Sequence, residues 1–139
     1  MERAKSILLK KQNLTDREWN EMKKHTIYGA KILNEPDFKI AKNIALYHHE
    51  KYNGNGYPYG LKGNDIPIEA QIVSHADVYD ALRSNRPYKK GFSHNIAVEI
   101  ILNGDNRTNP EDFNPKILKI FRTYHMEFKK LYDEYKENN

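Results

Sequence analysis

Apolar residues recur at helical spacing along the first third of the chain. From Trp19 to Leu33 they return every three or four residues, and Pro36 ends the run. Thr15 stands before this run, and Glu18 follows Thr15 by three residues. This is the form of a capping box, in which the hydroxyl and the carboxylate each accept a backbone N–H at the helix start. The pattern predicts a helix that begins at Thr15 and ends before Pro36.

Three prolines and one serine mark the starts of four further predicted helices. Proline suits the first turn of a helix because its missing N–H would lack an intrahelical partner there, and serine is a preferred N-cap. These starts are Pro36, Pro67, Ser93 and Pro115. The second helix is predicted to continue to Tyr52, the third to Leu82, and the fourth past Ile101. The predicted fold class is all-α, a compact helical bundle of about five helices with no convincing strand.

A glycine-rich stretch interrupts the helical pattern at residues 53–64. It holds four glycines and one proline in twelve residues, so it predicts a loop with several special backbone angles. A second loop is predicted over residues 103–114, before the final helix.

Composition narrows the class of protein. The 139 residues suit a single domain over residues 1–139, and the absence of cysteine excludes disulfides and thiolate metal sites. No apolar run is long enough for a membrane span. The net charge of +4 comes from lysines interleaved with acids, which is typical of solvated helix faces. We therefore expect a cytoplasmic protein that binds neither membrane nor nucleic acid.

Three histidines and one aspartate stand on the inward sides of the predicted helices. They are His25, His48, His49 and Asp77. Imidazole nitrogens with a carboxylate oxygen suit Fe, Mn, Zn or similar divalent ions. From the residues alone a second interpretation stays open, in which each is a hydrogen-bonded core residue. The remaining histidines, His75, His94 and His125, have no such context and are interpreted as structural.

Long strings of the sequence resemble one family. Residues 48–63 read HHEKYNGNGYPYGLKG, which closely resembles the segment that defines HD-GYP domains, a histidine pair followed by a Gly-Tyr-Pro loop. Shorter matches follow and precede it in the family's order. They are Asp77-Val78-Tyr79-Asp80, Arg86-Pro87-Tyr88-Lys89, Met22-Lys23-Lys24-His25, and the segment from Ile7 through Leu14. The resemblance covers the chain from about Ile7 to Phe121, and it implies an HD-domain-like helical fold.

The resemblance also implies an activity and a site. Family members are metal-dependent phosphodiesterases that hydrolyse cyclic di-GMP to linear pGpG and, in many members, GMP. The matched metal ligands are His25, His48, His49 and Asp77. Asp80 matches an acidic position expected to serve catalysis by orienting a ligand or handling the substrate. Tyr57, Arg86 and Lys89 match substrate-binding positions. The implied cofactor is a divalent metal, Fe or Mn in the first place, with Zn, Ni or Mg as alternatives.

One part of the family pattern is missing from the sequence. The His-Asp pair stands upstream of the segment matched by Ile7 to Leu14, and residues 1–6 contain neither residue. We therefore expect an incomplete metal site, weak or no turnover by this chain alone, and an apolar face that a second copy buries in a homo-oligomer.

Two classes of function are therefore carried forward. The first is cyclic di-GMP hydrolysis, and the second is a non-catalytic remnant that binds a nucleotide or a protein partner through the Gly-Tyr-Pro loop. Another phosphohydrolase activity of the wider HD superfamily is a weaker third alternative.

Overall fold

The computed structural model describes residues 14–138, so the match that begins at Ile7 lies partly outside the described residues. Within that range the chain forms six α-helices and three short 3-10 turns, and its only β-pairing is the isolated bridge between Arg86 and Lys89. The α-helices are α2 (Asp16–Lys23), α3 (His25–Ile32), α4 (Lys39–Tyr47), α5 (Ile68–Arg83), α6 (His94–Asn103) and α7 (Pro115–Asn138). The 3-10 turns are η1 (Pro36–Phe38), η2 (Gly63–Asp65) and η3 (Pro110–Asp112). The predicted all-α fold class is confirmed.

The predicted helix starts rest on the expected hydrogen bonds. The Thr15 hydroxyl accepts the Glu18 N–H at 3.1 Å, and the Glu18 carboxylate accepts the Thr15 N–H at 3.0 Å. The Ser93 hydroxyl accepts the Ile96 N–H at 3.4 Å at the start of α6. Pro67 directly precedes α5 and Pro115 is the first residue of α7, as predicted.

The prediction of one continuous helix before Pro36 was wrong, because the chain breaks between α2 and α3 at Lys24. Two side chains compete there with the backbone for carbonyls of the preceding turn. The Thr26 hydroxyl donates to the Lys23 carbonyl, and the His25 ring bonds the Met22 carbonyl. The Lys24 N–H also donates to the Glu21 carbonyl, three residues earlier, a 3-10 type bond that tightens the turn.

The second helix was also predicted too long. It begins at Lys39, after the turn η1, and it ends at Tyr47 with His48 as its C-cap. The Glu50 N–H bonds the Tyr47 carbonyl, which turns the chain out of the helix. As a result residues 48–52 are not helical, contrary to the prediction, and the two adjacent histidines lie just past the helix end.

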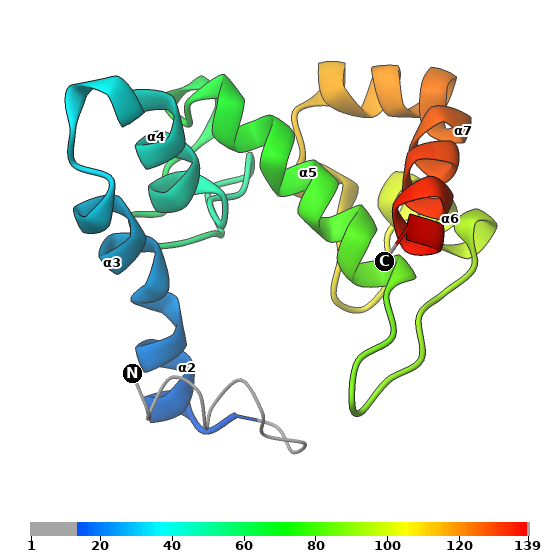
Figure 1. Cartoon of the computed structure of the whole chain (residues 1–139), viewed down its shortest axis with the longest axis horizontal. Coiled ribbons are helices and arrows are strands. Elements are labelled where there is room, and N and C mark those ends of the chain that lie inside the picture. The colour runs from blue at the N-terminus through cyan, green and yellow to red at the C-terminus, as the bar shows by residue number, and fades with distance from the viewer. Residues whose placement is uncertain (1–13, 139) are drawn as a thin grey trace.

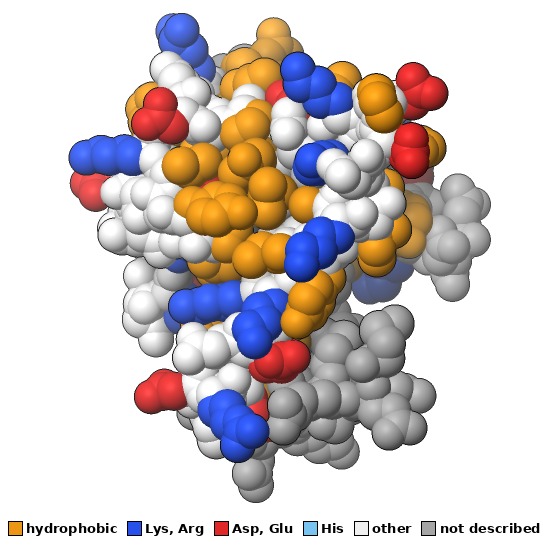
Figure 2. Space-filling view, turned by 90° about the vertical axis from the view of Figure 1, so that its left-hand side faces the viewer, with side chains coloured by type: hydrophobic (Ala, Val, Ile, Leu, Met, Phe, Trp, Pro, Cys, Tyr) orange, Lys and Arg blue, Asp and Glu red, His pale blue; other side chains and the backbone are white. Residues whose placement is uncertain are grey.

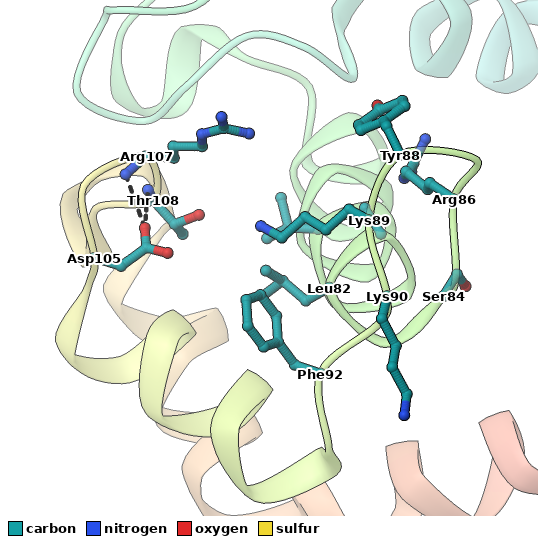
Figure 3. Close-up of a pocket in the computed structure, with 12 residues that line it drawn as sticks. Leu82, Ser84, Arg86, Tyr88, Lys89, Lys90, Phe92, Asp105, Arg107 and Thr108 are labelled. Atoms are coloured by element: carbon teal, nitrogen blue, oxygen red, sulfur yellow. Dashed lines mark hydrogen bonds between the residues drawn. The ribbon is translucent and has the colours of Figure 1, made fainter. Parts of the chain in front are cut away.

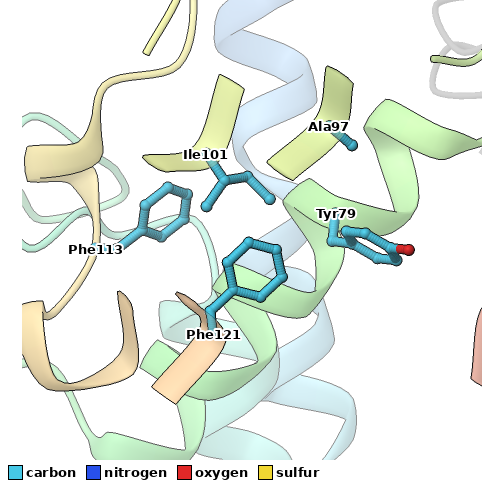
Figure 4. Packing of buried hydrophobic residues seen from close by; sticks show 5 residues of the cluster. All are labelled: Tyr79, Ala97, Ile101, Phe113 and Phe121. Atoms are coloured by element: carbon cyan, nitrogen blue, oxygen red, sulfur yellow. The ribbon is translucent and has the colours of Figure 1, made fainter. Parts of the chain in front are cut away.

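Helix α5 connects two groups of helices. Helix α4 packs along its N-terminal part and carries α3 on its other side, and α6 and α7 pack along its C-terminal part (Figure 1). The hydrophobic core cluster lies where α5 meets the second group. Its buried members are Tyr79, Ala97, Ile101, Phe113 and Phe121 (Figure 4). By contrast, α2 and α4 hold no buried residue at all. The two halves are therefore stabilised differently.

Large apolar side chains are exposed on the N-terminal half. Figure 2 shows hydrophobic side chains gathered on the face at the left of Figure 1. In this half Ile32 and Ile40 expose 81% and 66% of their surface, respectively. None of the described helices is both long and apolar enough to span a bilayer.

Candidate metal centre

Three of the predicted ligands converge at one place. His25 is the first residue of α3, His48 caps α4, and His49 follows it, so the break at Lys24 and the end of α4 together position the site. One ring nitrogen from each of the three lies within 4.8 Å of the others, and all three rings are half-buried. No other group of three or more histidine or acidic side chains in residues 14–138 gathers in this way.

Hydrogen bonds to helix carbonyls orient two of these rings. The His25 Nδ1 lies 2.6 Å from the Met22 carbonyl, and the His48 Nδ1 lies 2.8 Å from the Ile44 carbonyl. Because a carbonyl oxygen only accepts, Nδ1 carries the proton in both rings. The Nε2 lone pairs are therefore left for a ligand, which is the arrangement found in metal-binding histidines.

The third histidine is kept neutral by its surroundings. Burial in the first place, together with the nearby His48 and His25, lowers the pKa of His49 from 6.5 to about 3. A neutral imidazole has a free lone pair at pH 7, which metal binding requires. Its ring stacks on Tyr57, with centroids 4.8 Å apart and an interplanar angle of 11°. Burial also raises the pKa of Tyr57 to about 12, so the phenol stays protonated.

The Gly-Tyr-Pro loop positions Tyr57 by packing its backbone closely against the backbone that follows the histidine pair. A Cβ on Gly56 would lie 2.4 Å from both the His49 carbonyl oxygen and the Lys51 nitrogen. Only glycine therefore fits where the loop returns to the histidine pair. The Tyr57 N–H then donates to the His49 carbonyl at 3.1 Å.

A buried carboxylate supports the same loop. Glu50 is 2% exposed and accepts three backbone N–H groups. They belong to Tyr59, Gly60 and Leu61, at 2.6, 3.1 and 2.9 Å. Charge-assisted bonds of this kind are about twice as strong as neutral ones. Sequence reasoning missed Glu50, although an acid between the histidine pair and a glycine-rich loop was a signal that could have identified it.

Two side chains of α2 form the rim beside Tyr57. Trp19 contacts the Tyr57 ring edge-on, with centroids 6.2 Å apart. The Lys23 ammonium lies 5.8 Å from the Trp19 ring centre and 5.6 Å from the Tyr57 ring centre. The rim is therefore aromatic and positively charged.

The two predicted acidic residues lie on α5 near the histidines. Asp77 is close enough to His48 to affect its own ionisation, but it is not a member of the three-histidine group. Partial desolvation raises the pKa of Asp77, an effect that His48 opposes and Asp80 reinforces. Asp80 is exposed and its carboxylate accepts the Ser84 hydroxyl at 3.4 Å.

The predicted phosphate-binding residues lie beyond the end of α5. Arg86 and Lys89 exchange two backbone hydrogen bonds of 2.7 and 3.1 Å around a two-residue turn. The two residues are therefore directly opposed across the turn, and the Lys89 ammonium lies 4.7 Å from the Phe92 ring centre. A Cβ on Gly91 would lie 2.0 Å from the Arg83 carbonyl, so glycine is required where this segment returns to α5.

These residues fit a divalent metal on the histidine side. Three half-buried imidazoles with converging nitrogens, two of them oriented through Nδ1 and the third kept neutral, provide a suitable donor set. Nothing in the donor set selects one divalent metal over another. Of the site residues proposed from the sequence, only the histidines form a compact group.

The chain is similar to one known family and to several proteins that are named phosphodiesterases. A family model described as "HD domain" matches residues 4–111. A cyclic di-GMP phosphodiesterase of Vibrio cholerae is 39% identical over 95% of this chain and 28% of its own length. One from Thermotoga maritima is 50% identical over 60% of this chain and 23% of its own length. A 3'3'-cGAMP-specific phosphodiesterase of Vibrio cholerae is 40% identical over 88% of this chain and 23% of its own length. The chain spans about a quarter of the length of these relatives.

Proposed function

Because the chain belongs to the HD domain family, we propose that it forms part of a metal-dependent phosphodiesterase that hydrolyses cyclic di-GMP. The observation that carries this proposal is the convergence of His25, His48 and His49 on one point with their free nitrogens available. A divalent metal bound there supplies Lewis-acid polarisation of a phosphoryl oxygen and lowers the pKa of water. The names of the relatives support a cyclic dinucleotide as the substrate.

Each remaining residue has a role that its position supports. Arg86 and Lys89 bind phosphate, since a guanidinium fork and an ammonium directly opposed across a turn can neutralise phosphoryl oxygens. Tyr57 stacks on His49, so its ring edge stays available for a nucleobase. Trp19, which contacts Tyr57 edge-on, offers a second aromatic surface beside it. Asp77 completes the set of metal ligands. Asp80 orients one of these ligands or contacts the substrate. Iron or manganese is the metal that we expect, as proposed from the family resemblance.

The test is product formation by metal-loaded protein. Protein loaded with Mn²⁺ or Fe²⁺ is incubated with cyclic di-GMP, and the products are separated by chromatography. Because we expect weak turnover by this chain alone, the expected result is a small amount of linear pGpG from the wild-type chain and none from His48→Ala. If the protein binds one or more metal ions per chain and cyclic di-GMP but releases no product, the non-catalytic nucleotide-binding alternative replaces this proposal.

We further propose that the chain associates with a second copy of itself. The support is the exposure of Ile32 and Ile40, since monomers rarely leave large contiguous apolar patches in contact with water. A protein partner at the Gly-Tyr-Pro loop and a cytoplasmic location also stay predictions.

A further inference from the structure

A cavity of about 260 Å³ lies beyond the metal centre, between the end of α5, the segment that follows it and a loop about twenty residues further along the chain. The C-terminal part of α5 forms its floor, residues 84–92 form one wall, and the loop 104–108 forms the other (Figure 3). The floor is apolar and includes Val78, Leu82 and Phe92. Drug-sized ligands occupy pockets of about 300–1,000 Å³. The cavity therefore suits one nucleotide of a cyclic dinucleotide rather than the whole molecule.

The cavity lies on the same side of α5 as the metal centre. Ala81 lines it, and Ala81 follows Asp77 by four residues of one helix, so the two share a face. Asp77 in turn interacts with His48. A ligand that spans more than one nucleotide can therefore contact the histidines at one end and this cavity at the other.

Cations approach the cavity from two sides. Lys89 extends into it from residues 84–92, and Arg107 extends over it from the opposite wall (Figure 3). The carboxylate of Asp105 is the single acid among the lining residues. One of its oxygens already accepts the N–H groups of Arg107 and Thr108, at 2.8 and 2.7 Å. Positive charge therefore exceeds negative charge in the cavity, which favours an anionic group.

The loop that carries Arg107 is held in a fixed conformation. Besides the two bonds to its carboxylate, Asp105 donates its own N–H to the Thr108 carbonyl at 2.9 Å. Gly104, which precedes it, has φ +89, a conformation that favours glycine. A Cβ there would lie 3.1 Å from the Thr108 carbonyl oxygen. The backbone at Arg107 is therefore positioned before a ligand arrives, which lowers the entropy cost of binding.

We propose that Arg107 is a substrate-positioning residue that binds the second, non-reacting phosphate of a cyclic dinucleotide. A cyclic dinucleotide carries two phosphodiesters in one ring, and hydrolysis opens one of them. In this arrangement the phosphate that reacts lies at the histidines, and Lys89 and Arg107 hold the other phosphate from the two facing walls of the cavity. The inference rests on the proposed function, and it adds a residue that neither the family resemblance nor the relatives' names assign.

Binding measurements test the role of Arg107 without turnover. Chelator-treated protein is titrated with cyclic di-GMP by calorimetry, as wild type, Arg107→Ala, Arg107→Lys and Lys130→Ala. A lost charged hydrogen bond costs about 1.5–3 kcal/mol, so we expect the Kd of Arg107→Ala to rise about 10- to 100-fold. Arg107→Lys should recover part of this loss. Lys130 is the matched control because it is an exposed cation on α7 that does not line the cavity, and its variant should bind as wild type does.

Kinetics separate positioning from a general structural effect. With metal-loaded protein, Arg107→Ala should raise KM for cyclic di-GMP while kcat changes less than about threefold, because a contact to the non-reacting phosphate is equally strong in the ground and transition states. Hydrolysis of bis(p-nitrophenyl) phosphate, which has a single phosphodiester, should be unchanged. If Arg107→Ala binds and hydrolyses cyclic di-GMP as wild type does, the inference is wrong and the proposed function stands. If wild type neither binds nor hydrolyses it, both are wrong.

Discussion

The first three histidines of the chain and the last three have opposite surroundings. His25, His48 and His49 are half-buried at the ends of helices, and their ring nitrogens converge without bonding one another. His75, His94 and His125 lie in or against the hydrophobic core. His75 is 2% exposed and packs edge-on against Phe113, Phe121 and Phe128.

Two histidines of the second set, His94 and His125, are hydrogen-bonded within the protein. Arg83 donates to the Tyr79 oxygen at 2.7 Å, so the Tyr79 hydroxyl must donate onward to the His94 Nδ1 at 2.9 Å. The His94 Nε2 then donates to the His125 Nδ1, also at 2.9 Å. This chain of bonds leaves neither nitrogen of His94 for a ligand. The comparison shows that the free lone pair, rather than the residue type or burial alone, distinguishes a candidate metal ligand from a structural histidine.

The largest expected effect is the loss of metal affinity when a histidine of the first set is removed, compared with removal of a histidine of the second set. In His48→Ala we expect metal affinity to fall by more than the 10- to 100-fold typical of residues that only orient a ligand. In His125→Ala it should stay at the wild-type value. Metal content after dialysis, measured by mass spectrometry, checks both. Equal loss of metal in the two variants would remove the distinction between the sets.

Acid should destabilise the protein through the second set. Burial lowers the pKa of His75 to about 4, below its ordinary 6.5, so the unfolded chain takes up this proton first as the pH falls. The stability contribution of His75 is therefore complete above pH 6.5 and is lost between pH 6.5 and 4, by about 3 kcal/mol in total. Burial and the nearby His125 also lower the pKa of His94, so this histidine, like His75, makes the folded protein less stable in acid.

Urea unfolding of metal-free protein at pH 7 and pH 5 measures this loss. Between pH 7 and pH 5 the unfolding free energy of His75→Leu should fall by about 2 kcal/mol less than that of wild type, because leucine does not titrate. Leucine also removes the buried Nε2, which has no hydrogen-bond partner among the described residues. An unchanged pH dependence in His75→Leu would mean that His75 is protonated in the folded protein.

A smaller effect is expected from the loop that supports the first set. Glu50→Gln replaces one accepting oxygen by an NH₂ group, so at least one of the three backbone N–H groups loses its partner. We expect a loss of about 1–3 kcal/mol in unfolding free energy and a modest loss of metal affinity. Glu127→Gln, an exposed change on α7, is the matched control and should be neutral. No change in Glu50→Gln would show that the glycines alone determine the loop.

Self-association should be the weakest effect. Sedimentation velocity over a wide concentration range is expected to show a reversible increase in mass that Ile32→Glu reduces. Ile120→Glu, at an exposed position of the other half, is the control and should leave the increase unchanged. A monomer at every concentration would contradict the proposal.

Local signals in the sequence predicted the helix starts, because a cap and its partner lie within three residues of each other. The capping box at Thr15 and the N-cap at Ser93 are of this kind. The break at Lys24 escaped prediction because the apolar spacing continues across it, while the side chains of His25 and Thr26 bond to the preceding turn.

Features that depend on distant segments were beyond the sequence pattern. The histidine group was proposed from inward spacing and the family resemblance, but its geometry depends on where α4 ends. The contribution of Glu50 depends on amides nine to eleven residues away. Arg107 faces Lys89 only because α6 and the following loop fold back beside α5 (Figure 3). Nothing in the local pattern of either residue indicates that approach.

Trp19 gives the molecule a built-in optical probe. It is the only tryptophan of the sequence, and it contacts Tyr57, whose ring stacks on His49. Its fluorescence emission therefore reports on one place, the rim of the histidine site, with no background from tryptophan in the core. Paramagnetic ions and nucleobases both quench indole fluorescence at short range, so occupation of the site can be followed in real time without a label.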